Sequence, residues 1–150
     1  MAKLISEDVE TKSSFEIVAT GEKILHGEET WQLVAIRLTS GTQVLTTESL
    51  AAQENCVLCR IPRDEIAQLL YLLNEIVKSR IDSFSFEPLE PFFEFNVEYS
   101  ADQGFKVEAW IDAGNAHTGT YTFDACGIRF HTTKDGLSSF IIELEREFPC

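Results

Sequence analysis

The sequence lacks the features of membrane, secreted and common catalytic proteins. No apolar run approaches the length of about 18 residues that a membrane-spanning helix needs. Residues 1–14 contain an early lysine and then mainly acidic and polar residues. A secretory signal instead has a basic segment, an apolar segment and small residues, in that order. The GxSxG, HExxH, P-loop and GxGxxG motifs are missing, and the three histidines are isolated. We therefore expect a cytoplasmic protein that is not an enzyme.

Positive charge is scarce. Lys and Arg number 12 against 25 Asp and Glu, which gives a formal net charge of −13. A surface of this sign repels nucleic-acid phosphates and anionic lipids and attracts basic surfaces. The charge therefore favours neither nucleic-acid nor membrane binding. It fits a basic protein partner, and it also fits an acidity that serves only solubility.

Cysteine is sparse, with four residues in the chain. Cys56 and Cys59 form a CxxC pair, but the surrounding sequence is strand-like, and positions i and i+3 of a strand point to opposite faces. No second CxxC is present to complete a zinc ligand set with them. We expect free thiols, no bound metal and no cofactor.

Two segments have the apolar spacing of amphipathic helices. Large apolar side chains recur at i, i+3, i+4 and i+7 from Ile61 to Ile81, where Pro62 suits a first helical turn. The same spacing returns from Lys134 to Glu147, with Thr133 as the N-cap. The predicted buried faces are Ile66, Leu69, Leu70, Leu73 and Val77, and then Leu137, Phe140, Ile141, Leu144 and Phe148.

The rest of the chain has the alternation and turn signals of strands. Strands are predicted at 13–20, 30–39, 42–48, 56–61, 83–87, 92–99, 105–112, 118–125 and 127–131. Residues 1–13 are expected to be a partly disordered lead-in, and 21–29 a charged loop. A run of strands followed by a helix occurs twice. The sequence therefore predicts one α+β domain over residues 1–150, with a largely antiparallel sheet, two helices and pseudo-duplicated halves.

The clearest predicted hairpin joins residues 92–99 to 105–112. Pairing Tyr99 with Phe105 sets apolar residues opposite one another along one face and Glu98 opposite Lys106 on the other. On that second face Trp110 lies across from Glu94. Because tryptophan is enriched among interface hot spots, and an arginine of a partner could stack on the ring, this face is a candidate interface. The candidate partner-binding residues are Glu94, Glu98, Glu108, Trp110 and Asp112. In the alternative interpretation another element covers Trp110.

Several features also occur together in a known family. They are Trp31 at the start of a central strand, a helix with Leu69, Leu70 and Leu73, the residues Phe84, Glu87, Pro88 and Phe92 around a Glu-Pro turn, and a last helix ending in Glu147, Phe148 and Pro149. In these features the chain resembles the WapI-type immunity proteins, which protect bacteria against their own polymorphic toxins. The resemblance covers roughly residues 15–149 and implies a cytosolic inhibitor of a cognate toxin domain without catalytic residues.

Two other functions fit the same residues. The first is a small-molecule-binding or enzymatic α+β domain with a pocket between sheet and helices. The second is a housekeeping or structural subunit. The partner expected under the immunity hypothesis is a basic protein, such as a toxin domain.

Overall fold

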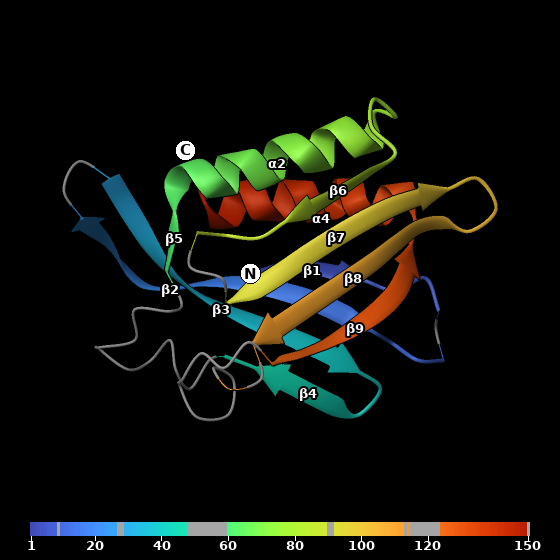
Figure 1. Cartoon of the computed structure of the whole chain (residues 1–150), viewed down its shortest axis with the longest axis horizontal. Coiled ribbons are helices and arrows are strands. Elements are labelled where there is room, and N and C mark those ends of the chain that lie inside the picture. Colours follow the sequence, from blue (N-terminus) through green and yellow to red (C-terminus); the bar gives the residue numbers. More distant parts are fainter. Residues whose placement is uncertain are drawn as a thin grey trace.

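The structure is a computed structural model that describes residues 1–8, 10–26, 29–47, 60–89, 92–112, 114 and 124–149; for 21–26, 29–30 and 60–63 it describes the backbone alone. Within these residues the chain forms two antiparallel sheets and the helices α2 and α4 (Figure 1). The first sheet contains, in spatial order, β1 (Ala2–Ile5), β2 (Ser14–His26), β3 (Glu29–Ser40) and β4 (Gln43–Thr46), with β5 (Arg60–Pro62) also paired to β3. The second contains β6 (Ser83–Phe86), β7 (Phe93–Ser100), β8 (Gly104–Asp112) and β9 (Ala125–Thr132). The helices are α2 (Arg63–Val77) and α4 (Lys134–Glu147).

The predicted α+β class with repeated halves is confirmed. In each half, four antiparallel strands follow one another in sequence order, and a helix comes after them. The structure has two separate sheets where the sequence predicts one. Among the described residues, only the first half has a fifth strand, β5, paired with β3. Antiparallel neighbours need only short turns, which is why each half can build its sheet from consecutive segments.

Both helices pack against the core through the faces that the apolar spacing predicted. Four of the five predicted residues of α2 are buried, and the fifth, Val77, is only partly buried. All five residues predicted for the second face are buried; four lie in α4 and Phe148 is its C-cap. The hydroxyl of Thr133 accepts a hydrogen bond from the Gly136 N–H at 3.0 Å, as expected of an N-cap. The predicted place of Pro62 in the first helical turn is wrong, because Pro62 ends β5 and α2 begins at the next residue.

The core lies between the two sheets and the helices. The ring of Phe15, on β2, has its centroid 4.6 Å from that of Phe95 on β7 and 5.9 Å from that of Phe140 on α4. The buried apolar residues of both halves form one cluster. Since apolar burial is the main stabilising term in folding, the halves support each other through this shared core.

The expected disordered lead-in is wrong for its first residues. Ala2–Ile5 form β1, in which Ala2 and Leu4 are fully buried. The N–H of Lys3 donates to a carboxylate oxygen of Glu143 in α4 at 2.8 Å, so the helix satisfies a backbone donor on the free edge of the strand. The acidic residues that follow suggested disorder, whereas the burial that orders β1 comes from a helix near the other end of the chain.

The expected charged loop at 21–29 is also wrong. Strand β2 continues to His26, β3 begins at Glu29, and the two pair from Ser14 to His26 with a register irregularity between Ala19 and Lys23. Backbone pairing with β3 satisfies the peptide groups of this segment whatever the charge of its side chains.

Some predictions fall outside the described residues. They are the loop at 49–55, the CxxC pair with most of the strand at 56–61, the turn at 113–116, and most of the strand at 118–125. The remaining predicted strands, including 83–87 and 127–131, are confirmed as β6 and β9. Among the helices that the structure describes, none has the length and apolar character needed to cross a membrane.

Candidate partner-binding site

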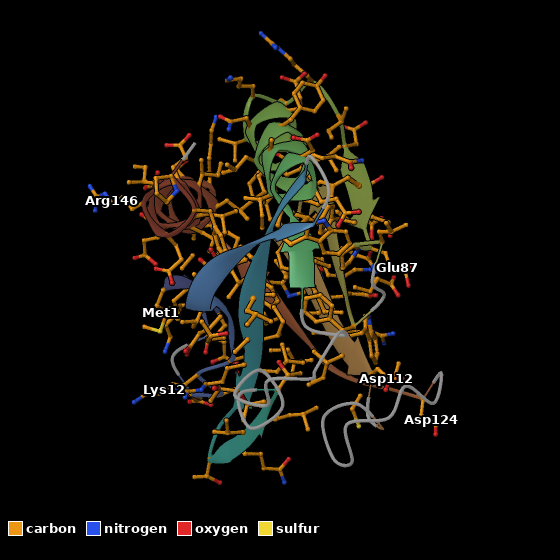
Figure 2. The ribbon with its side chains drawn as sticks, turned by 90° about the vertical axis from the view of Figure 1, so that its left-hand side faces the viewer. Met1, Lys12, Glu87, Asp112, Asp124 and Arg146 are labelled. Carbon is orange, nitrogen blue, oxygen red and sulfur yellow. The ribbon has the colours of Figure 1, made fainter. Side chains whose placement is uncertain are left out.

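The second sheet has one side turned away from the core, and we call it the outer face. Its residues are Ser83, Ser85, Glu94, Asn96, Glu98, Lys106, Glu108, Trp110, Gly127, Arg129 and His131. In Figure 1 the first sheet lies behind β7, β8 and β9, so the outer face is turned toward the viewer. Figure 2 shows Glu87 and Asp112, which border this sheet, on the opposite side of the molecule from Arg146 of α4. The outer face is therefore remote from the C-terminal helix.

The predicted hairpin register is confirmed at every pair. Tyr99 pairs with Phe105, Glu98 with Lys106, and Glu94 with Trp110. On the inner face of the same strands, Phe93, Phe95, Val97, Val107, Ala109 and Ile111 are all buried. A shift of one residue would move this apolar set to the solvent side, and so the alternation fixes the outer face.

The carboxylates of the outer face are already paired within the chain. The Lys106 ammonium lies 2.9 Å from the Glu98 carboxylate and 3.4 Å from that of Glu108. The Arg129 Nε lies 3.1 Å from the Glu108 carboxylate. The hydrogen bond from Lys106 lowers the pKa of Glu98, and the hydrogen bonds to Glu98 and then Glu108 raise the pKa of Lys106. The outer face is thus a surface of alternating charge, in which Glu108 is paired as well as the predicted Glu98–Lys106 pair.

Trp110 lies flat across the neighbouring strand. An ideal Cβ placed on Gly127 would be 2.4 Å from Cε3 and 2.7 Å from Cδ2 of the indole, so the ring occupies the space that a side chain at 127 would need. The guanidinium carbon of Arg129 is 5.3 Å from the ring centroid, within the range of a cation–π contact. Trp110 is partly buried, and the chain's own Arg129 takes the place that the sequence assigned to an arginine of the partner.

Asp112 is not accessible on the outer face as predicted. It has the same alternation as Trp110, but it is buried, with 6% of its surface exposed, and its N–H donates to the Phe92 carbonyl at 3.3 Å. The alternation of β8 indicates the side on which Asp112 lies and could not indicate its burial. Glu94, Glu98, Glu108 and Trp110 do lie together, and Glu94 accepts a hydrogen bond from the Asn96 side-chain amide at 2.6 Å.

Gly127 and Arg129 are the residues that sequence reasoning missed. The predicted strand 127–131 already placed Ile128 and Phe130 on one face, which leaves Gly127 and Arg129 on the other. Pairing that strand with 105–112 in the observed register sets Arg129 opposite Glu108 and Gly127 opposite Trp110. The signal was present in the alternation, but the two strands had not been paired with each other.

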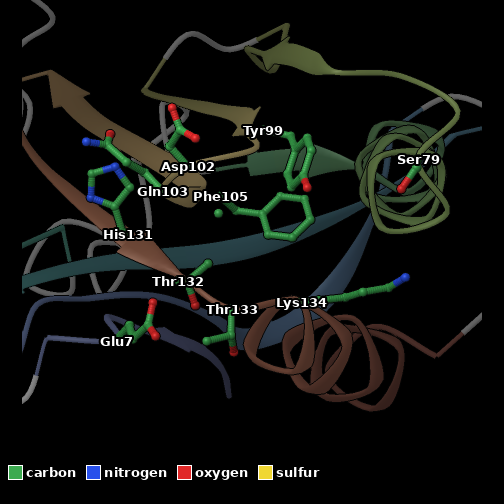
Figure 3. A pocket seen from close by; sticks show the side chains of 11 residues that line it. Glu7, Ser79, Tyr99, Asp102, Gln103, Phe105, His131, Thr132, Thr133 and Lys134 are labelled. Carbon is green, nitrogen blue, oxygen red and sulfur yellow. The ribbon is translucent and has the colours of Figure 1, made fainter.

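A second candidate site is a cavity of about 750 Å³ at the turn between β7 and β8 (Figure 3). One wall is made by Tyr99 and Phe105, whose ring centroids are 5.1 Å apart. Figure 3 shows Asp102, Gln103 and His131 grouped on one side of it, with Lys134 beside the start of α4. This cavity is the one that a small-molecule function would use.

Two threonine hydroxyls of the cavity are already engaged. Thr132 donates to the Ile5 carbonyl at 2.9 Å, and Thr133 accepts from the Gly136 N–H as the cap of α4. Neither hydroxyl is paired with a general base, which an activated nucleophile requires. Within the described ranges, no group of three or more His, Cys, Asp and Glu side chains could hold a metal ion. No family model, curated protein or solved structure matches this chain.

Proposed function

We propose that this chain is a cytoplasmic binding protein that neutralises a basic protein by covering its surface, as an immunity protein does with a toxin domain. The observation that carries the proposal is the outer face, where the half-buried Trp110 lies across from Glu94 and beside Glu108, with Glu98 farther along the same face. A large aromatic side chain with a polar surround is the usual composition of an interface hot spot.

The charge of the whole chain supports the same proposal. A net charge of −13 would attract a basic partner from a distance and speed its association. The resemblance to WapI-type immunity proteins adds the expectation that this partner is a toxin domain. Binding by occlusion would need no catalytic group.

The cavity at the β7–β8 turn favours a second function, the binding of a small molecule. Its volume of about 750 Å³ suits an organic ligand, and the Tyr99–Phe105 wall could contact a flat apolar group. Lys134 and Glu7 on its rim offer charges of both signs. This function would leave Trp110 without a role.

A growth-protection assay in bacteria can distinguish the two proposed functions. The chain is co-expressed in a bacterium with a candidate toxin domain taken from a neighbouring gene, and growth and direct binding are measured. We expect Trp110→Ala to weaken binding by about 2 kcal/mol, or roughly 30-fold in Kd, and to lose protection while the protein remains folded. Glu98→Lys should mainly slow association at low salt, because Glu98 is exposed.

The matched control is Tyr71→Ala, which removes an exposed aromatic side chain from α2, away from the outer face. This variant should protect as well as the parent. Full protection by Trp110→Ala, together with loss of protection by Tyr99→Ala, would contradict binding through the outer face and assign the function to the cavity.

A further inference from the structure

We propose that the outer face receives a carboxylate of its partner on Arg129, beside Trp110; this inference rests on the proposed function and names the chemistry of its central contact. The partner would be basic as a whole and would present one acidic side chain at this point. From the hairpin alone we expected an arginine of the partner to stack on Trp110. We now place an acidic side chain of the partner on Arg129 instead.

Arg129 has the geometry of a prepared carboxylate receptor. Its Nε is bound to Glu108 at 3.1 Å and its guanidinium lies over the Trp110 ring at 5.3 Å, so two contacts hold the group in place. Its side chain is nevertheless 65% exposed. A guanidinium also has N–H donors on both terminal nitrogens, and the contact with Glu108 is made through Nε. Two terminal nitrogens in one plane match the two oxygens of a carboxylate.

The neighbouring charges disfavour a cation of the partner at the same point. Lys106 and Arg129 both lie against Glu108, so two positive groups already share its carboxylate. An arginine stacking on Trp110 would have to displace Arg129 and break its pair with Glu108. An incoming carboxylate meets both positive groups and needs neither displacement.

Two acidic groups oppose the proposal: Glu108, whose carboxylate Lys106 and Arg129 already share, and Glu94. Glu94 lies across from Trp110 on β7, and it would repel a second carboxylate. Its oxygen accepts a hydrogen bond from Asn96 at 2.6 Å, which holds part of its charge toward β7 and away from Arg129 on β9. Since β8 separates β7 from β9, Arg129 is the nearer of the two charged groups to any ligand bound at the β9 side of the ring.

Gly127 makes the arrangement possible. Because Gly127 has no side chain, the indole lies in the space above its backbone. Arg129, two residues farther along the same face of β9, can then reach over the ring. A side chain at 127 would raise the ring and separate it from the guanidinium.

Ionic quenching of fluorescence tests the proposal without a partner. A Trp31→Phe variant emits from Trp110 alone, and its quenching by iodide, caesium and acrylamide is measured at constant ionic strength. The acidic chain predicts better quenching by caesium, whereas Arg129 predicts better quenching by iodide. We expect an iodide-to-caesium ratio of about 2 or more after normalisation to acrylamide, because the nearest charge dominates at short range.

Variants and a carboxylate probe complete the test. Arg129→Gln should lower the ratio at least about twofold, while Arg80→Gln, the same change at an exposed arginine paired with Glu75, should leave it unchanged. Replacing chloride by acetate should reduce iodide quenching in the parent and not in Arg129→Gln. Preferential quenching by caesium, equal effects of the two variants, or no effect of acetate would overturn the proposal. Growth protection would still test partner binding, so the two failures are distinguishable.

Discussion

Replacing Gly127 by alanine should move the Trp110 indole and destabilise the sheet beneath it. The new Cβ would lie 2.4 Å from the Ala109 carbonyl oxygen and 2.4 Å from Cε3 of the indole. Both distances are well below van der Waals contact. The indole can rotate away, but the carbonyl belongs to the backbone of β8 and can move only with the β8–β9 pairing.

The magnitude follows from these two contacts. Forcing an additional carbon into a packed site costs about 1–3 kcal/mol. Replacing glycine also restricts the unfolded chain, which returns about 0.4–1 kcal/mol at a position that alanine can adopt. We therefore expect a net loss of about 1–2 kcal/mol in the free energy of unfolding. Urea unfolding followed by circular dichroism should show a lower midpoint with an unchanged m-value.

Trp110 itself provides the second measurement. In the Trp31→Phe background, Gly127→Ala should increase acrylamide quenching and shift the emission to longer wavelength, because the raised ring contacts more water. The control is Cys126→Ala at the adjacent exposed position, which should change stability by less than about 0.5 kcal/mol. A Gly127→Ala protein with the parent's stability and the parent's quenching would refute the placement of the indole over Gly127.

Two further predictions concern the core and the outer-face ion pairs. Leu73→Ala and Leu144→Ala remove fully buried side chains from equivalent helices and should each cost about 2–5 kcal/mol in urea unfolding; losses below about 1 kcal/mol at both sites would contradict their burial. Lys106→Met should raise the pKa of Glu98 in an NMR titration, because the hydrogen bond that lowers it is removed. The stabilising contribution of this pair is present above the unfolded-state pKa of Glu98 and is lost as the pH falls through the folded value, and an unchanged Glu98 titration would argue against the contact.

The elements that local pattern specifies were predictable. The helix faces follow from 3.6-residue spacing, and the β7–β8 register follows from two strands that alternate in phase across a short turn. Trp110 could be placed opposite Glu94 by counting residues back from that turn. In each case the residues that determine the structure are close together in the sequence.

Several of the errors concern contacts between distant segments. Burial of Leu4 depends on packing between β1 and α4, and burial of Asp112 accompanies the approach of Phe92 to the end of β8. Arg129 reaches the hairpin only through the pairing of β9 with β8. The alternation of residues in a strand indicates on which side each residue lies. Which residue becomes its neighbour on that side depends on which strands pair.

The pairing of strands also determines which charges the acidic chain presents at the outer face. The net charge of −13 indicates which partners are attracted from a distance, but contacts at the interface depend on local pairing. On the outer face, Lys106 and Arg129 hold the acids of the hairpin, so a uniformly basic surface would meet two cations of its own sign at the centre. A partner that binds there needs an acid where Arg129 is exposed and bases opposite Glu94 and the exposed carboxylate of Glu98. Such an alternating pattern distinguishes one basic protein from another, which net attraction alone cannot do.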